Sequence, residues 1–219
     1  MTTWNEAWSW TKLDVYRTCP RKFKYQFIDK IPQPDSPALK RGSEIHKGLE
    51  SWLNGWQSAL PEAAEKWRQP LQRLKDQPTV KPEQALGLNK DWSLRKDWFG
   101  KDCWLRVKMD AYYFTADELV AIDFKTGKYR IPSTDQVELY ACAGIELAPH
   151  VKQVRAEFWF IDTEELYHKI YTVPEIQDSR RKFERAIVPM YNDTTWKATP
   201  SQECRWCPYS KTKGGSCEF

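Results

Sequence analysis

The stretch "AIDFKTGK", Ala121–Lys128, places two charged side chains in a segment that otherwise looks like a buried strand. Because side chains alternate along a strand, Asp123 and Lys125 point to one face while Phe124 points to the other. The Thr-Gly pair that follows is typical of a turn. The stretch therefore predicts a strand, and its charged pair can be part of a solvated edge, a structural ion pair or half of an active site.

The preceding segment predicts a partner for this strand. Between Cys103 and Phe124 the apolar residues alternate with polar ones, which favours a hairpin-like pair of strands. If Asp110 faces the same way as Asp123, two carboxylates and the Lys125 ammonium meet at one spot. Hard oxygen ligands suit Mg²⁺ or Mn²⁺, and a nearby lysine orients water and stabilises charge on a phosphate. An exposed ion pair on a half-solvated sheet is the alternative on these residues alone.

Helical spacing predicts helices on both sides of these strands. The expected helical segments are "SWTKLD" with Thr11 and Asp14 as a capping box, "CPRKFKYQFI" opened by Pro20, residues 39–56, "PEAAEKWRQPLQRLKD" kinked or ended near Pro70, "STDQVELYACAGIEL" capped by Ser133 or Thr134, and "PEIQDSRRKFERAIVPMY". Two further strands are expected at "VRAEFWFID" and "LYHKIYTV". The sequence therefore predicts both helices and strands.

Length and composition limit the classes of protein to which the chain can belong. At 219 residues the chain is expected to form a single domain, 1–219. With 29% charged residues and no apolar run of 18 residues, we expect no transmembrane span and no membrane partner. The start "MTTWNEAWSWTKLD" lacks the regions of a signal peptide. We expect a cytoplasmic protein, in the host cytoplasm if the chain is viral.

Charge is unevenly distributed, although the net charge is only +4. Between Lys12 and Lys47, Lys and Arg outnumber Asp and Glu, and aromatic residues are interleaved with them. Cations mixed with flat rings suit single-stranded nucleic acid, whereas a solvated basic helix face is the alternative. The candidate DNA contacts from this segment are Arg17, Arg21, Lys22 and Arg41.

Six cysteines in a chain expected to be cytoplasmic favour metal binding, catalysis or core packing over a disulfide framework. Cys204 and Cys207 form a CxxC pair, and Cys217 follows after nine further residues. An upstream cysteine would complete a four-cysteine site, which zinc and iron–sulfur clusters both use. Cys103 and Cys142 are interpreted as small core residues.

Four blocks of the sequence stand in a familiar order. These are "RGSEIHKGLE", "VKMDAYY", "AIDFKTGK" and "QVELYACA". In order and rough spacing they resemble the RecB-like nucleases of the PD-(D/E)xK superfamily, over nearly the whole chain. The resemblance implies an α/β (α+β) fold, namely a restriction-endonuclease-like core with a central mixed sheet flanked by helices.

The resemblance also implies roles for the matching residues. The implied metal ligands are His46, Asp110, Asp123 and the main-chain carbonyl of Phe124, and the implied catalytic set is Asp110, Asp123, Lys125, Gln136 and Tyr140. In the family the lysine assists the attacking water, whereas the Gln and Tyr contact DNA and support the site. Met109 stands where the superfamily name has Pro. An imidazole ligand shifts the metal preference from Mg²⁺ towards Mn²⁺.

The placement of the cysteines, one near the start and three at the end, is similar to the iron–sulfur members of this group. These include the CRISPR adaptation nuclease and the AddB-type helicase–nuclease subunit. The resemblance implies a 4Fe-4S cluster on Cys19, Cys204, Cys207 and Cys217, so that segments 1–30 and 200–219 join in one metal-cluster region. Zinc on the same residues is the alternative. The spacing before Cys217 is longer than we expect for the group.

Together these features predict a metal-dependent DNA nuclease, an exonuclease that acts on single-stranded DNA or DNA ends by water attack on a phosphodiester. The alternative is a non-cleaving, zinc- or iron–sulfur-stapled nucleic-acid-binding subunit of a larger recombination or CRISPR adaptation complex. The chain has no P-loop motif, so any unwinding would come from a helicase partner.

Overall fold

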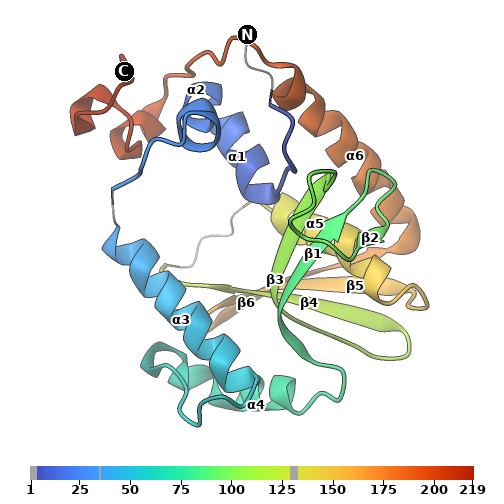
Figure 1. Cartoon of the computed structure of the whole chain (residues 1–219). Helices are drawn as coiled ribbons and strands as arrows, with labels where there is room; N and C mark the ends of the chain where they lie inside the picture. Colours follow the sequence, from blue (N-terminus) through green and yellow to red (C-terminus); the bar gives the residue numbers. More distant parts are fainter. Residues whose placement is uncertain (1–3, 35, 129–132) are drawn as a thin grey trace.

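The computed structural model describes residues 4–34, 36–128 and 133–219, and its centre is a six-stranded sheet (Figure 1). The strands are β1 (Lys81–Leu88), β2 (Leu94–Arg95), β3 (Leu105–Phe114), β4 (Glu118–Lys125), β5 (Gln153–Phe160) and β6 (Glu165–Thr172). Their order is β2-β1-β3-β4-β5-β6. Strands β4 and β5 pair in parallel, whereas the other neighbours are antiparallel. The sheet is therefore mixed, as predicted.

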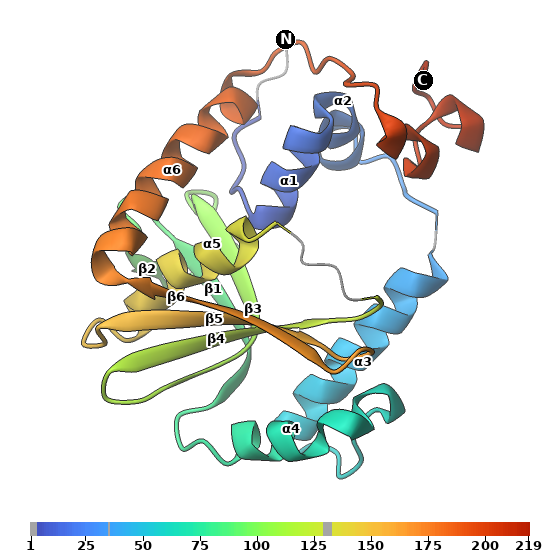
Figure 2. The same cartoon turned by 180° about the vertical axis from the view of Figure 1, so that it is seen from behind.

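Helices lie on both faces of the sheet. The α-helices are α1 (Trp10–Thr18), α2 (Pro20–Phe23), α3 (Pro37–Leu53), α4 (Arg68–Lys75), α5 (Asp135–Gly144) and α6 (Val173–Asn192). Shorter helical segments are a π-helix at Lys24–Ile28 and 3₁₀ turns at Glu62–Trp67, Ile145–Leu147, Gln202–Trp206 and Lys211–Lys213. Helices α5 and α6 cover one face and α3 and α4 the other, which the reverse view in Figure 2 also shows. The prediction of a central mixed sheet flanked by helices is confirmed.

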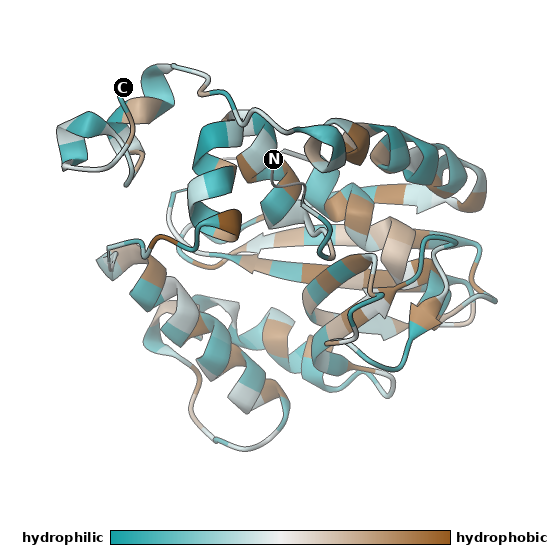
Figure 3. Ribbon diagram, turned by 45° about the horizontal axis from the view of Figure 1, so that its top comes forward, coloured by the Kyte–Doolittle hydropathy of each residue, from teal (hydrophilic) through white to brown (hydrophobic). Residues whose placement is uncertain are grey.

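Strand β4 lies inside this sandwich and is buried on both faces. Leu119 and Ala121 pack in the core under α5 and α6, while Ile122 and Phe124 pack in the core under α3 and α4. A strand covered on both faces is expected to be almost continuously apolar, which explains why Asp123 stands out in it. Figure 3 shows the strands rich in hydrophobic residues, whereas the C-terminal tail is mostly hydrophilic. Among the described residues, no helix is long and apolar enough to cross a bilayer.

The start of α1 differs from the prediction. The N-cap is Ser9, whose hydroxyl accepts a hydrogen bond from the Lys12 amide at 3.4 Å, and not a Thr11–Asp14 box. The predicted second helical piece is confirmed, with Pro20 in the first turn and Cys19 at the N-cap. Cys19 therefore lies at the junction of two helices.

The break predicted near Pro70 lies earlier. A 3₁₀ turn ends at Trp67 and α4 begins at Arg68, so Pro70 falls within the first turn of α4. A proline is tolerated there because its missing N–H has no partner in the helix. For α5, Thr134 is the N-cap residue, but the Ser133 hydroxyl is the side chain that accepts a hydrogen bond, from the Asp135 amide at 3.3 Å.

The two ends of the described chain pack against different parts of the fold. Residues before α1 lie beside β3, where the Arg106 amide donates to the Trp8 carbonyl at 2.8 Å. The tail after α6 returns to the α2 region, where the Tyr209 hydroxyl donates to the Ile31 carbonyl at 3.1 Å. Figure 1 shows this tail beside α2.

Candidate active site

Strands β3 and β4 stop pairing where the charged residues begin. In the described residues their ladder runs from Phe114↔Leu119 to Ala111↔Ile122. One step further, Oδ2 of Asp110 accepts a hydrogen bond from the Phe124 amide at 2.7 Å. A side-chain oxygen thus replaces a strand carbonyl as acceptor, which turns the Asp110 carboxylate towards the end of β4.

Asp123 is the buried centre of a hydrogen-bonded network. Its Oδ1 accepts from the Tyr140 hydroxyl at 2.6 Å and from Gln136 Nε2 at 3.0 Å. Its Oδ2 lies 2.6 Å from Lys125 Nζ and accepts no further hydrogen bond from the described residues. Lys125 Nζ also donates to Gln136 Oε1 at 2.9 Å. Helix α5 therefore holds Asp123 and Lys125 of β4 through one amide and one phenol.

His46 approaches the network from α3, on the other side of the strand. Its Nδ1 lies 3.0 Å from Asp110 Oδ1, and its ring packs 6.4 Å from the ring of Phe124. A glycine allows this approach, because a Cβ on Gly42 would lie 3.1 Å from the Thr126 hydroxyl. The ring of Phe124 is buried in the core, as its position between the two charges predicts.

The electrostatics of the network follow from burial. Burial raises the pKa of Asp123, as does the charge of Asp110, although Lys125 opposes both. Burial and the charges of Asp123 and Asp110 hold the pKa of Tyr140 well above its ordinary value, so its hydroxyl remains a donor. Burial lowers the pKa of His46, but the hydrogen bond to Asp110 and the negative charge of Asp110 raise it. The raising effects are larger in sum, so the pKa of His46 lies above its ordinary value.

The donor set can be tested against a divalent metal. Within the described ranges, no three His, Cys, Asp or Glu side chains converge closely enough to hold a metal ion. Here His46 and Asp110 bond to each other, and Lys125 lies against Asp123. An imidazole and two carboxylates, one with an oxygen that accepts no hydrogen bond, nevertheless form a set that Mn²⁺ or Mg²⁺ accepts. The residue types fit the metal.

The predicted DNA-contacting cations do not form a row of unpaired charges. Arg17 pairs with Asp135 at 2.7 Å, and Arg41 holds both oxygens of Asp162. Arg21 donates to the Trp196 carbonyl at 2.8 Å and lies 3.8 Å from Glu218, while Lys22 lines the cysteine pocket described next. Their role in DNA binding stays a prediction.

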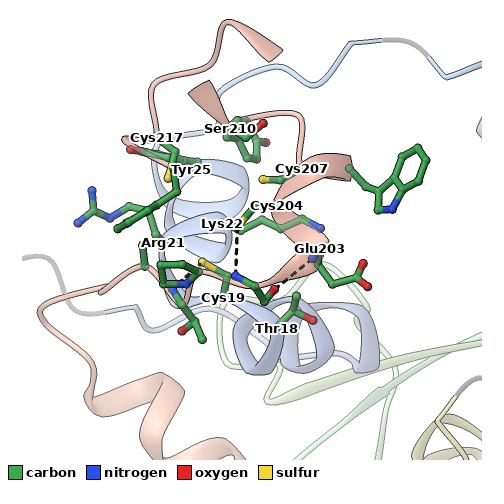
Figure 4. A pocket seen from close by; sticks show the side chains of 17 residues that line it. Thr18, Cys19, Arg21, Lys22, Tyr25, Glu203, Cys204, Cys207, Ser210 and Cys217 are labelled. Carbon is green, nitrogen blue, oxygen red and sulfur yellow. Dashed lines mark hydrogen bonds between the residues drawn. The ribbon is translucent and has the colours of Figure 1, made fainter. Parts of the chain in front are cut away.

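Cys19, Cys204, Cys207 and Cys217 line one pocket of about 70 Å³ between α2 and the tail (Figure 4). All four are free thiols. Cys19 Sγ accepts from the Thr199 amide and Cys204 Sγ accepts from the Ser201 amide, both at 3.4 Å. The four residues that the family resemblance implies therefore face a common space, although the 4Fe-4S cluster itself stays a prediction.

A tight turn brings Cys217 back to this pocket. Its amide donates to the Tyr209 carbonyl at 2.9 Å, and Gly214 adopts a positive φ of 74°. A Cβ on Gly215 would lie 2.3 Å from the Tyr209 main chain, so only glycine fits there. This turn accounts for the long spacing before Cys217. Cys103 and Cys142 are buried in the core, as predicted.

Asp162 was not singled out from the sequence, yet it joins two parts of the site. Its carboxylate accepts from Arg41 at the start of α3 and from the Gly127 amide after β4. No local pattern marks this residue, because its partners are distant in sequence. It holds the helix of His46 against the turn that follows Lys125.

A model of the PD-(D/E)XK nuclease superfamily matches residues 7–212. No curated protein is similar enough in sequence to count as a match. Two solved structures are similar. SSO0001 is 17% identical, with a TM-score of 0.51, and the match covers 100% of this chain and 89% of that chain. The other, from Eubacterium rectale, bears the provisional name exonuclease; it is 13% identical, with a TM-score of 0.55, and the match covers 93% of this chain and 87% of that chain. These identities establish likeness of fold alone, in agreement with a restriction-endonuclease-like core. Because the family model spans nearly the whole sequence, the chain belongs to the PD-(D/E)XK nuclease superfamily.

Proposed function

We propose that this protein is a metal-dependent DNA nuclease, an exonuclease acting on single-stranded DNA or DNA ends. The observation that supports it is the continuous network in which α5 braces Asp123 and Lys125 of β4. An isolated Asp–Lys pair on a sheet would need no such support. Membership of a nuclease superfamily agrees with the assignment.

The proposed metal is Mn²⁺ or Mg²⁺, held by His46, Asp110, Asp123 and the carbonyl of Phe124. When bound, such an ion polarises a phosphate and lowers the pKa of water. The Lys125 ammonium, 2.6 Å from Asp123 Oδ2, orients water and offsets negative charge that develops on the phosphate. Gln136 and Tyr140 hold Asp123 in one orientation, and in the proposal they also lie beside the DNA.

The test is cleavage of end-labelled single- and double-stranded DNA by purified protein with Mn²⁺ or Mg²⁺. We expect cleavage by the parent and loss of it in Lys125→Ala. Lys152→Ala is the matched control, because this lysine is exposed and its ion pair is with the exposed Asp117. Intact DNA after incubation with the parent, or equal rates for Lys125→Ala and the parent, would overturn the proposal.

We also propose a 4Fe-4S cluster on Cys19, Cys204, Cys207 and Cys217, with zinc as the alternative metal. Support comes from the common pocket of these cysteines and from the two amide N–H groups that point at sulfur. Its role would be to fasten the segment around α2 to the tail, without redox chemistry. An anaerobic preparation with broad visible absorbance is expected, whereas a colourless protein with stoichiometric zinc would select the alternative.

A partner remains part of the proposal. In one arrangement the chain is a nuclease that acts alone in the cytoplasm. In the other it is a subunit that works with a helicase, or within a recombination or CRISPR adaptation complex. The complete His46, Asp110, Asp123 and Lys125 set argues against a non-cleaving subunit. Cleavage by the isolated chain would favour the first arrangement.

A further inference from the structure

A groove of about 340 Å³ begins at the catalytic network and runs between α1, β3 and the loop before β3. We call it the tryptophan groove, and its defining residues are Trp10, Trp98, Arg106, Lys108, Gln136 and Tyr140. Gln136 and Tyr140 also contact Asp123. The groove and the candidate active site therefore share two residues and are continuous.

The charge of the groove is of one sign. Lys12, Arg106 and Lys108 line it, and none of the described lining residues carries a carboxylate. Lys12 pairs with Glu6 and Lys108 with Glu83, outside the groove. Such a surface attracts an anion.

Arg106 differs from the two lysines. It has no carboxylate partner among the described residues; its Nε donates to the Trp98 carbonyl at 3.0 Å and its guanidinium lies 5.7 Å from the centre of the Trp98 ring. The remaining guanidinium donors are held in place and have no protein acceptor in the described residues. A fixed, unpaired guanidinium suits a phosphate group.

Strand β3 leads from this arginine to the candidate metal site. Arg106, Lys108 and Asp110 occupy alternate positions, so they share one face of the strand at steps of about 7 Å. A second hollow shares Arg106 and is also lined by Phe99, which is 83% exposed, and by Glu6, the ion-pair partner of Lys12. The path beyond the groove is thus lined by another exposed ring.

Partly exposed Trp10 and Trp98 provide flat apolar surfaces within the groove. We propose that a single DNA strand lies in the tryptophan groove as it enters or leaves the active site, with bases stacked on Trp10 and Trp98 and a phosphate on Arg106. This inference rests on the proposed nuclease function and adds the strand path to it. The proposed path runs along β3 and does not pass the predicted cations of α1, α2 and α3, which are Arg17, Arg21, Lys22 and Arg41.

The test measures binding without cleavage. A fluorescein-labelled oligo-dT is titrated with protein in EDTA, and anisotropy gives the Kd. Trp98→Ala and Arg106→Gln are each expected to bind at least about fivefold more weakly than the parent. Arg106→Gln should also reduce the slope of log K against log salt by about 0.7, as expected when one phosphate contact is lost from a single strand.

Matched controls are Trp56→Ala and Arg181→Gln, which alter an indole and a guanidinium that are exposed elsewhere and line none of the described pockets near the site. All variants are checked by thermal unfolding, and a closed hairpin duplex serves as a second probe. Trp98→Ala should bind this duplex as the parent does. A loss below about fivefold in oligo-dT affinity for folded Trp98→Ala and Arg106→Gln overturns the strand path.

Equal loss of duplex affinity in Trp98→Ala overturns the assignment to a single strand. If the parent cuts and binds DNA but the groove variants bind normally, the groove inference fails and the nuclease proposal stands. If the parent neither binds nor cuts DNA, the proposed function fails and the groove inference fails with it.

Discussion

Gln136 and Lys125 are joined by a 2.9 Å hydrogen bond that links the first turn of α5 to the last residue of β4. The same amide donates to Asp123 and to the Tyr140 hydroxyl, so its orientation is fixed by three partners. Helix α5 thus sets the relative position of the two charged groups.

The first prediction concerns this brace. Gln136→Ala should lower the cleavage rate by about 10- to 100-fold, because small displacements of catalytic groups are costly. Tyr140→Phe keeps the ring but removes the shortest hydrogen bond to Asp123, and it should also lower the stability by about 1.5–3 kcal/mol. Single-turnover cleavage and urea unfolding measure the two effects. Unchanged rates in both variants would show that the brace does not position the site.

The second prediction concerns Asp162. Hydrogen bonding to Arg41 holds the pKa of Asp162 below its ordinary value of 3.8, and the Gly127 amide adds to this. A depressed carboxylate pKa contributes stability above 3.8 that is lost as the pH falls through the folded value. Asp162→Asn should therefore destabilise the protein by about 1 kcal/mol at pH 7, and by progressively less below about pH 4.

Urea unfolding at neutral and acid pH checks this dependence. Asp117→Asn is the control, because the ion pair of Asp117 with Lys152 is exposed on both sides and should contribute little to stability. A destabilisation by Asp162→Asn that is the same at pH 7 and pH 3 would contradict the role given to the ion pair.

The third prediction concerns Gly215. Any side chain there would collide with the Tyr209 main chain, so Gly215→Ala should displace the turn that returns Cys217 to the pocket. The proposed cluster or zinc should then be lost or bound more weakly. Metal content per chain is the measurement, and Ser216→Ala, which removes only an exposed hydroxyl, is the control. Full metal content in Gly215→Ala would show that Cys217 is not a ligand.

The fourth prediction concerns Cys19. Cys19→Ala should release the metal and lower the melting temperature, because the link between the α2 segment and the tail is lost. Cys103→Ala removes a buried thiol that does not line the pocket, and it should retain the metal. Metal analysis and thermal unfolding of both variants give the answer. A fully metallated Cys19→Ala protein would exclude this residue.

Much of the sheet was predictable because its signals are local. The apolar run around Asp123 and the alternation before it predict β4 and β3, and both strands are present. The grouping of Asp110, Asp123 and Lys125 also follows from strand geometry once the hairpin is assumed. These inferences needed only neighbouring residues.

The remaining features depend on contacts between distant segments. Nothing local predicts that Asp110 accepts from the Phe124 amide, or that Asp162 joins α3 to the turn after β4. The cap of α1 was misplaced because Thr11 matches the box pattern, whereas Ser9 is the residue with extended backbone geometry. Nothing local in the sequence marks Arg106, because the fold alone shows that it has no acidic partner among the described residues.

The contacts of the candidate active site differ in the sequence separation of the residues that they join. Gln136 and Tyr140 reach Asp123 within β4 and the helix that follows it, whereas His46 reaches Asp110 across 64 positions of sequence. Contacts of long sequence separation cost more chain entropy and tend to form late in folding. A partly folded chain with β4 and α5 in place but α3 undocked would hold the lysine and lack the imidazole. The proposed metal site would then be complete only after α3 has docked.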